Sequence, residues 1–308
     1  MNVVFMGTPE FAVPTLGHLM ASQHDLLAVV TQPDRPKGRG QKLTQTPIKK
    51  IASELGINIL QPKSLRDSNF TQTLKNLDPD LLIVVAFSIL PRKILRIPRL
   101  GSINLHPSLL PAYRGAAPIV WAIANGETQT GLTTFLLNSN VDSGKILLQN
   151  EVPIYPEETA GQLQARLSIL GADLVIETMK RLENETLDPQ PQSEAGVSYA
   201  PKLTKDDGRI DWTQSAETIH NRIRGFNPFP GAFTMYNNQS LRIHQTLCIE
   251  TQYDVPGQII EADPGGQLVV ACGQNSLSLL ELQPAGKNRM SSNAFLNGNS
   301  LSIGQVLH

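Results

Sequence analysis

The stretch Asn2-Val3-Val4-Phe5-Met6, followed by Gly7-Thr8-Pro9-Glu10, decides the fold class. The first run is continuously apolar, which is typical of a strand covered on both faces of a sheet. The next four residues are turn formers, and residues 11–22 have apolar side chains at helical spacing, with Pro14 tolerated only in the first turn. The sequence therefore predicts a strand, a turn and a helix at the start of the chain.

The same alternation continues over the first 180 residues. It predicts further strands at 26–31, 57–60, 81–86 and 101–106, paired strands at 130–137 and 144–154, and helices at 47–55, 68–77, 91–95, 117–124 and 160–181. Ser68 is the predicted N-cap of its helix. This rhythm predicts an α/β fold with a doubly wound, Rossmann-like, mostly parallel sheet.

The character of the chain changes after Glu185. Residues 188–194 are polar and proline-rich, which is typical of a linker. A helix is predicted at 216–224, and short strands follow at 240–250, 257–260, 267–271 and 276–283. We therefore expect one domain at 1–187, a linker at 188–204, and a small β-barrel or sandwich at 205–308.

Composition bounds the class of protein. Hydrophobic residues make up 40% of the 308, enough for a large core, and the net charge of −1 argues against a surface built entirely for nucleic acid. Cys248 and Cys272 match no metal spacing and fit a reducing compartment. The N-terminus lacks secretory features, and the apolar stretch 81–90 is too short to cross a bilayer as a helix. We expect a soluble, cytoplasmic protein that does not enter membranes.

Polar side chains follow the predicted strand 101–106. Open α/β sheets bind ligands beyond the carboxyl ends of their strands, and Asn104 and His106, two residues apart, point to one face. An amide donor beside an imidazole suits a carbonyl that becomes a tetrahedral oxyanion. Asp142, in the turn 140–144, could orient the histidine or accept a proton from an attacking amine through water.

Each of these features has a simpler explanation when taken alone. An Asn-x-His pair is common, and a single aspartate in a turn usually serves the turn itself. Spacing by itself supports only an oxyanion-binding pair at a cleft. Residues 7–12 do not form a glycine-rich dinucleotide fingerprint, and the phosphate-binding P-loop pattern is absent, so no nicotinamide role is supported.

Longer motifs surround these residues. The run from Asn104 to Ile119 (NLHPSLLPAYRGAAPI) resembles the signature of the 10-formyltetrahydrofolate-dependent formyltransferases. Residues 3–12 resemble the first strand and turn of that family, 86–91 its folate-side loop and 140–144 its aspartate turn. The resemblance implies that Asn104 holds the formyl oxygen, that His106 assists and passes a proton to the departing folate nitrogen, and that Asp142 sets the state of His106 and helps to deprotonate the amine.

The resemblance also implies a formyl donor and its pocket. The donor would be 10-formyltetrahydrofolate, and no metal would be needed because that formyl group is already activated. The expected folate contacts are Ser108, Leu109, Leu110, Pro111, Phe87 and Leu90. Ser88 departs from the family, which often has glycine there, and we expect it to tighten the pterin pocket slightly.

The acceptor is inferred from other regions. The loop 32–43 is basic, with Arg35, Lys37, Arg39 and Lys42 among glycines and prolines, and it resembles the insertion loop of the family members that formylate initiator methionyl-tRNA. Those members also carry an OB-like C-terminal domain, a fold that commonly binds nucleic acid. The resemblance implies an acceptor-stem contact for the loop and tRNA contacts for the basic residues Arg222, Arg224, Lys287 and Arg289, in a monomeric protein.

Acidic residues outnumber basic ones after Lys205, so any RNA surface there must be one-sided. Four alternatives stay open. Glycinamide ribonucleotide formyltransferases share the catalytic trio but stop near the end of the first domain. A sugar-nucleotide amine formyltransferase can share the two-domain plan without needing the basic loop. A hydrolase would release formate from formyltetrahydrofolate, and a non-catalytic RNA-binding module would keep only the shell of the enzyme.

Overall fold

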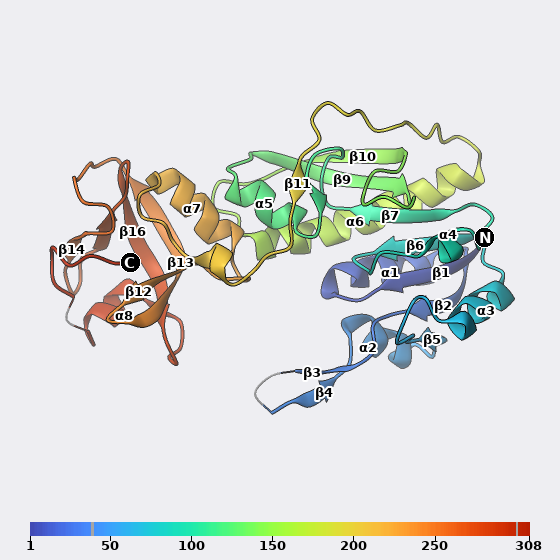
Figure 1. The fold of residues 1–308 in the computed structure, drawn as a ribbon, viewed down its shortest axis with the longest axis horizontal. Helices are drawn as coiled ribbons and strands as arrows, with labels where there is room; N and C mark the ends of the chain where they lie inside the picture. Colours follow the sequence, from blue (N-terminus) through green and yellow to red (C-terminus); the bar gives the residue numbers. More distant parts are fainter. Residues whose placement is uncertain (38–39, 300) are drawn as a thin grey trace. The chain divides into compact units, whose positions relative to one another are not determined.

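The structure is a computed structural model that describes residues 1–37, 40–299 and 301–308. Two compact units pack separately (Figure 1). Unit 1 consists of Met1–Pro118, Thr130–Pro153 and Gln164–Ala200. Unit 2 consists of Ile119–Gln129, Ile154–Leu163 and Pro201–His308. The segment predicted as a linker therefore packs with unit 1 as far as Ala200, and the start of the long helix packs with unit 2.

Unit 1 follows the predicted alternation of strands and helices. Its strands are β1 (Asn2–Gly7), β2 (Asp25–Val30), β3 (Arg35–Lys37), β4 (Lys42–Thr44), β5 (Ile59–Leu60), β6 (Leu81–Val85), β7 (Ser102–His106), β8 (Arg114–Gly115), β9 (Gln129–Leu136), β10 (Ile146–Pro153) and β11 (Tyr199–Ala200). Its helices are the 3-10 turn η1 (Glu10–Ala12), α1 (Val13–Ala21), α2 (Pro47–Glu54), α3 (Ser68–Leu77), α4 (Arg92–Leu95) and most of α6 (Ala160–Glu183).

Seven strands form one sheet in the order β10-β9-β7-β6-β1-β2-β5. The five strands from β7 to β5 are parallel to their neighbours, whereas β9 runs antiparallel to β7. The carboxyl ends of β7, β6, β1 and β2 therefore meet at one edge of the sheet. The predicted Rossmann-like architecture is confirmed, and so is the pairing of the strands near 130 and 146.

Apolar side chains cover both faces of this sheet. On one face, alternate residues of β1 and β6 pack with α3 and α4 in a core made of Val4, Met6, Leu82, Val84, Phe70, Leu74 and Ile94. On the other face, Leu105 of β7 lies against α6, because a Cβ placed on Gly171 would come 2.6 Å from the Leu105 side chain. Leu105 is paired with Val85, and Asn104 with Val84. Asn104 therefore belongs to the face covered by α3 and α4.

Unit 2 is built on an antiparallel sheet that curls around its own core. The strands are β12 (Phe233–Tyr236), β13 (Gln239–Ile249), β14 (Ile259–Ala262), β15 (Leu268–Ala271), β16 (Ser276–Pro284) and β17 (Met290–Ser291), ordered β12-β13-β16-β15-β14 with β17 beside β16. The helices are α5 (Pro118–Ala124), which starts in unit 1 at Pro118, the 3-10 turn η2 (Asp206–Gly208), α7 (Ala216–Gly225) and α8 (Ser292–Leu296). Ile219 and Ile223 of α7 pack into this core with Leu241 and Leu282. The curled sheet is of the expected OB-like kind.

Three local predictions differ from the structure. The N-cap of α3 is Asp67, whose carboxylate accepts from the backbone N–H of Asn69, and Ser68 is the first helical residue. The segment 32–43, predicted as an extended loop, contains the paired strands β3 and β4, which protrude as a hairpin in Figure 1. Strand β12 and helix α8 were not predicted. No helix in the described part of the chain has both the length and the apolar character needed to cross a membrane.

Candidate active site

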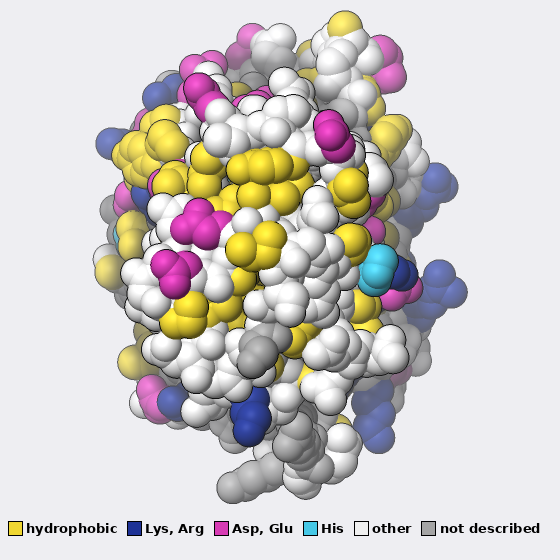
Figure 2. Space-filling view, turned by 90° about the vertical axis from the view of Figure 1, so that its left-hand side faces the viewer, with side chains coloured by type: hydrophobic (Ala, Val, Ile, Leu, Met, Phe, Trp, Pro, Cys, Tyr) yellow, Lys and Arg dark blue, Asp and Glu magenta, His cyan; other side chains and the backbone are white. Residues whose placement is uncertain are grey.

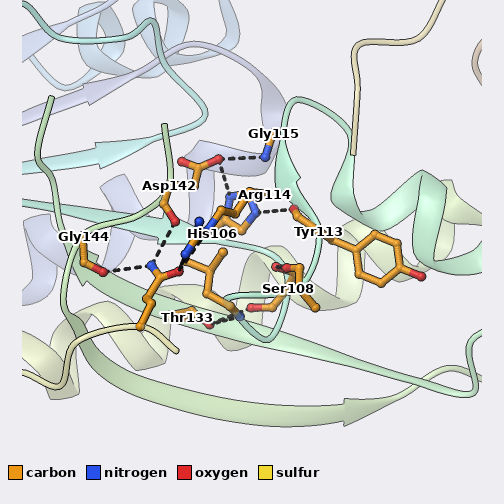
Figure 3. Close-up of polar contacts among 11 residues, drawn as sticks. His106, Ser108, Tyr113, Arg114, Gly115, Thr133, Asp142 and Gly144 are labelled. Carbon is orange, nitrogen blue, oxygen red and sulfur yellow. Dashed lines mark hydrogen bonds and ion pairs between the residues drawn. The ribbon is translucent and has the colours of Figure 1, made fainter. Parts of the chain in front are cut away.

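The end of β7 carries the predicted catalytic pair. His106 is 5% exposed, and its Nε2 lies 2.9 Å from the backbone oxygen of Tyr113 (Figure 3). Since a carbonyl oxygen can only accept, Nε2 bears the proton in the neutral ring and Nδ1 carries the lone pair. The Phe135 ring stands edge-on to the imidazole, with centroids 6.5 Å apart. Both contacts fix the plane of the His106 ring.

Asp142 faces the other nitrogen of that ring. Its Oδ2 lies 3.8 Å from His106 Nδ1 and accepts a hydrogen bond of 2.9 Å from the backbone N–H of Gly115. A separation of 3.8 Å is too long for a direct hydrogen bond. The carboxylate can therefore stabilise a protonated ring by charge, and a water molecule or substrate atom could complete the contact.

The turn that holds Asp142 has an unusual backbone. Asp142 adopts a φ of 47°, in the left-handed region that aspartate tolerates better than most residues. At Gly144, a Cβ would collide with the backbone oxygen of Leu136. The glycine is therefore required for the turn to lie this close to β9, and this approach brings the carboxylate to the histidine.

Burial lowers the pKa of His106 below its ordinary value of 6.5. The charge of Asp142 and the hydrogen bond to Tyr113 act in the opposite direction and are weaker than the burial. The imidazole is consequently neutral at physiological pH, with Nδ1 available to take a proton and Asp142 placed to stabilise the cation that results.

Asn104 lies two residues before His106 on the same face of β7. It is half-buried, and within the described residues its side-chain amide makes no hydrogen bond. Its two N–H donors are therefore free to bind an oxyanion near the imidazole. The structure thus places His106 beside Asp142, with Asn104 two residues before it on the same face of β7, as the sequence predicted.

The predicted folate contacts divide into buried and accessible residues. Ser108, Leu110 and Leu90 are buried, and the Ser108 hydroxyl donates to the Ala112 backbone oxygen at 2.6 Å, so these three support the loops from within. Leu109, Pro111 and Phe87 are partly exposed. Ile89 is 75% exposed in the loop after β6, and its residue type alone gave no sign of a contact.

Two pockets open at the carboxyl edge of the sheet. The larger, about 580 Å³, is lined by the turn after β1, the hairpin and the loop after β6. The smaller, about 280 Å³, is lined by residues after β5 and by the Phe87–Ile89 loop. Gln32 and Ser88 line both pockets, and Gln32 Nε2 donates to Ser88 Oγ at 2.7 Å. Ser88 thus joins two loops in the wall shared by the pockets.

The predicted tRNA contacts of unit 1 lie on the hairpin. Arg35 is exposed at the start of β3 and lines the larger pocket. Lys37 ends β3 and Lys42 begins β4, while Arg39 lies outside the described residues. The salt bridge between Asp34 and Lys49, 2.6 Å long, holds the base of the hairpin.

The predicted contacts of unit 2 are not equivalent. Lys287 and Arg289 are exposed, although Arg289 pairs with Glu281 at 2.9 Å, and Arg222 is half-buried over the Phe226 ring. Arg224 is 8% exposed and donates to Asn221 and to the Glu158 backbone. This burial argues against the predicted contact between Arg224 and tRNA. Figure 2 shows a face with hydrophobic and uncharged side chains, several acidic ones and basic ones mostly toward its edges.

Several residues that complete the site were not predicted. Tyr113 and Gly115 act through backbone groups, Arg114 is buried beside them, and Thr133 Oγ1 donates to the Ser108 backbone at 2.7 Å and accepts from the Leu110 N–H. Gln192 bonds to the Asp142 turn from a segment predicted as a linker. Over the described residues, no three His, Cys, Asp or Glu side chains are grouped as metal ligands.

Comparisons with known proteins show the family to which this chain belongs. Residues 1–179 match the family model described as formyl transferase, and residues 202–300 match its C-terminal domain. The methionyl-tRNA formyltransferase of Geobacter metallireducens is 47% identical over 305 residues, covering 99% of this chain and 97% of the relative. That of Alkaliphilus oremlandii is 48% identical over 309 residues, covering 100% and 99%.

A solved structure supports the fold at lower identity. The N-formyltransferase from Helicobacter canadensis, in complex with folinic acid and dTDP-3-aminofucose, matches with a TM-score of 0.67 at 19% identity, covering 90% of this chain and 98% of that one. At that identity only the fold is shared. With both family models and full-length relatives matched, the chain belongs to the formyl transferase family, in its methionyl-tRNA formyltransferase group.

Proposed function

We propose that this chain transfers the formyl group of 10-formyltetrahydrofolate to the α-amino group of methionyl-initiator tRNA. The product would be N-formylmethionyl-tRNA, the initiator of translation. The observation that carries the proposal is the neutral, buried His106 held between the Tyr113 carbonyl and Asp142, two residues beyond Asn104 on the same strand face, in a chain whose full-length relatives are named for this reaction.

The reaction would proceed by direct attack of the amine on the formyl carbon. A new C–N bond forms as the carbonyl oxygen takes the electron pair, and Asn104 donates to the oxyanion. The amine loses a proton to the Asp142–His106 pair. The bond from carbon to the folate nitrogen then breaks, and that proton passes to the nitrogen, which leaves as tetrahydrofolate. Atoms and charge balance without a further reactant.

The state of His106 suits this sequence of steps. A ring that is neutral before attack can take the proton through Nδ1, and Asp142 lowers the cost of the resulting charge. Because Nε2 is held by Tyr113, the ring need not rotate between taking and returning the proton. The atoms and charges balance in the same way if Asp142 takes the proton first or if it only stabilises the cation.

We place the last phosphates of the tRNA at the larger pocket, where Arg35 of the hairpin offers a cation. The lining of this pocket does not include Asn104, His106 or Asp142, so the aminoacyl end would extend past it to the end of β7. The donor would lie against Phe87 and the partly exposed Leu109 and Pro111. Ile89, exposed beside Phe87, is an added candidate for an apolar contact with the pterin. Unit 2 would contact the tRNA through Arg222 of α7 and through Lys287 and Arg289, which lie between β16 and β17.

The direct test offers several acceptors to the purified protein with 10-formyltetrahydrofolate. We expect formylmethionine on charged initiator tRNA, and no transfer to dTDP-3-aminofucose, the sugar nucleotide bound in the Helicobacter structure. A reaction without acceptor should release formate no faster than a blank. Transfer to the sugar alone, formate release alone, or tRNA binding without transfer would each replace the proposal with one of the alternatives raised from the sequence.

A further inference from the structure

Gln192 lies in the segment predicted as a linker, yet both the nitrogen and the oxygen of its side-chain amide form hydrogen bonds with residues of the candidate active site. Its Nε2 donates to the backbone oxygens of Asp142 and Gly144, at 2.9 and 2.8 Å. Its Oε1 accepts from Nε and a terminal nitrogen of Arg114, at 3.1 and 2.6 Å. One neutral side chain thus joins the aspartate turn to the buried arginine of β8.

The same segment also holds the residues on the other side of the catalytic pair. The Ser198 hydroxyl accepts from the Tyr113 N–H at 2.9 Å, and the Ser198 backbone oxygen accepts from the Arg114 N–H at 2.9 Å. Ala200 accepts from the Ala116 N–H at 2.8 Å, within the parallel pairing of β11 and β8. Residues 113–116, which we call the strap, are therefore held by hydrogen bonds to residues 198–200.

The strap carries both backbone partners of the reactive groups. The oxygen of Tyr113 holds Nε2 of His106, and the N–H of Gly115 holds the carboxylate of Asp142. Gln192 closes the arrangement, because it links the strap at Arg114 to the backbone carbonyls of Asp142 and Gly144 in the turn that carries the Asp142 side chain. A shift of either end would change the 3.8 Å separation between imidazole and carboxylate.

We propose that Gln192 is a positioning residue for formyl transfer, which fixes the Asp142–Gly144 turn against the strap and so sets the placement of the Asp142 carboxylate relative to His106. The inference rests on the proposed function for its rate measurements. It goes beyond that function because it gives a role in formyl transfer to a residue of the segment predicted as a linker, which packs with unit 1.

The chemistry of the position requires a neutral amide of this length. Two carbonyl oxygens face Nε2, so a carboxylate there would place negative charge against both of them while keeping the bond to Arg114. Asparagine is one methylene shorter and could not reach both Arg114 and the turn. Substitution by alanine would also leave the buried Arg114 guanidinium without the oxygen that accepts its hydrogen bonds.

The experiment compares Gln192→Ala and Gln192→Glu with a matched control, Gln190→Ala, two residues away. Within the described residues, the side-chain hydrogen bonds of Gln190 reach only Asp188, two residues before it. For each variant we would measure the single-turnover rate with saturating donor and charged tRNA, the dissociation constant for tRNA, and the pH dependence of the rate. We expect both Gln192 variants to lose roughly 10- to 100-fold in rate, with tRNA binding within about twofold, because displacement of a reactive group by an ångström has costs of that size.

A second measurement distinguishes positioning from a general loss of structure. NMR titration of the imidazole protons, with His106→Asn to assign the signal, reports the pKa of His106 directly. Asp142 raises that pKa against the larger effect of burial, so a displaced carboxylate should lower it further in both Gln192 variants and leave it unchanged in Gln190→Ala. The acid limb of the rate profile should move to lower pH with it.

The outcomes are separable. If the wild-type protein formylates no acceptor, the proposed function fails while the His106 titration still tests the role of Gln192. If the wild type is active and both Gln192 variants keep its rate and its His106 titration, the inference is overturned. It is also overturned if the variants lose rate only in proportion to lost folded protein, with the His106 titration unchanged.

Discussion

The end of β7 and the β3–β4 hairpin are built in opposite ways. At the end of β7, His106 is buried, Asp142 is half-buried, and backbone groups of the strap hold both. The hairpin consists of two three-residue strands that pair with each other, apart from the seven-stranded sheet, and its Leu43 is 66% exposed. One region is held from several sides, and the other projects into solvent.

This difference matches what each region would do. Making and breaking a C–N bond needs reacting groups placed to within a fraction of an ångström. Attraction between a lysine and a phosphate falls slowly with distance and tolerates a mobile side chain. Substitutions at the end of β7 should therefore change the rate of transfer, and those on the hairpin should change tRNA binding.

The largest effect should come from Asp142→Ala. Loss of the carboxylate removes the group that stabilises protonated His106, and general acid–base groups typically contribute 100- to 10,000-fold, so we expect a rate loss in about that range. Single-turnover transfer measures it, and tRNA affinity should stay within about twofold. Asp173→Ala is the control, because Asp173 is exposed and, within the described residues, its side chain pairs only with His18. Equal losses of rate and binding would contradict the assignment.

Gly144→Ala should affect both folding and transfer. The new Cβ would meet the Leu136 backbone oxygen, which cannot move without disturbing β9, so the Asp142 turn must shift. We expect a loss of about 1–3 kcal/mol in the free energy of unfolding, as overpacking usually costs, together with a clear loss of rate. Denaturant unfolding and transfer assays measure these. Gly17→Ala, where nothing lies within 4 Å of the new Cβ, should be neutral or slightly stabilising.

The double substitution Arg39→Ala, Lys42→Ala should raise the KM for tRNA about tenfold and leave the rate at saturation unchanged. Each cation that contacts a phosphate contributes about one unit to the slope of log affinity against log salt, so the slope should weaken by about two units. The control Lys50→Ala, Lys75→Ala removes the same charge from exposed helix positions. If the two double substitutions weakened tRNA binding equally, the hairpin cations would contribute only a general electrostatic attraction to tRNA, which would contradict a phosphate contact specific to the hairpin.

The smallest effect should appear in the pH dependence. The folded pKa of His106 lies below 6.5, so the acid limb of the rate should have its midpoint below pH 6.5. The same shift means that the unfolded chain binds more protons than the native one as pH falls through 6.5, so stability decreases from there toward the folded pKa. His106→Asn should flatten this dependence partly, since burial also lowers the pKa of His220 and His244. A midpoint above pH 6.5 would contradict the burial argument.

Most strands and helices of unit 1 could be predicted because each is determined by the pattern of residues within its own short stretch of sequence. Continuous apolar runs such as 81–85 form the buried strands, and the two-residue spacing of Asn104 and His106 placed them on one face of β7. The predicted N-cap of α3 was wrong because Asp67 and Ser68 are adjacent and both residue types can cap a helix. In the structure, the Asp67 carboxylate accepts the hydrogen bond from the backbone N–H of Asn69.

The contacts that hold His106 and Asp142 in place could not be predicted from the sequence. Tyr113 and Gly115 contribute backbone groups, and almost any residue carries those, so no side-chain type marks them. Gln192 lies 50 residues from Asp142 in the chain, within a composition typical of linkers. Burial of Arg224 depends on the backbone of Glu158, also distant in sequence. Each of these contacts exists only once the chain has folded.

The most direct test of this division of labour measures transfer rate and tRNA affinity on the same preparations of Asp142→Ala and of the Arg39→Ala, Lys42→Ala pair. Single-turnover formylation with saturating 10-formyltetrahydrofolate, over a titration of charged initiator tRNA, gives both quantities. We predict that Asp142→Ala binds tRNA normally and transfers at least about 100-fold more slowly, whereas the hairpin pair binds weakly and reaches the wild-type rate at saturation. A normal rate for Asp142→Ala, or a reduced saturating rate for the hairpin pair, would contradict the account.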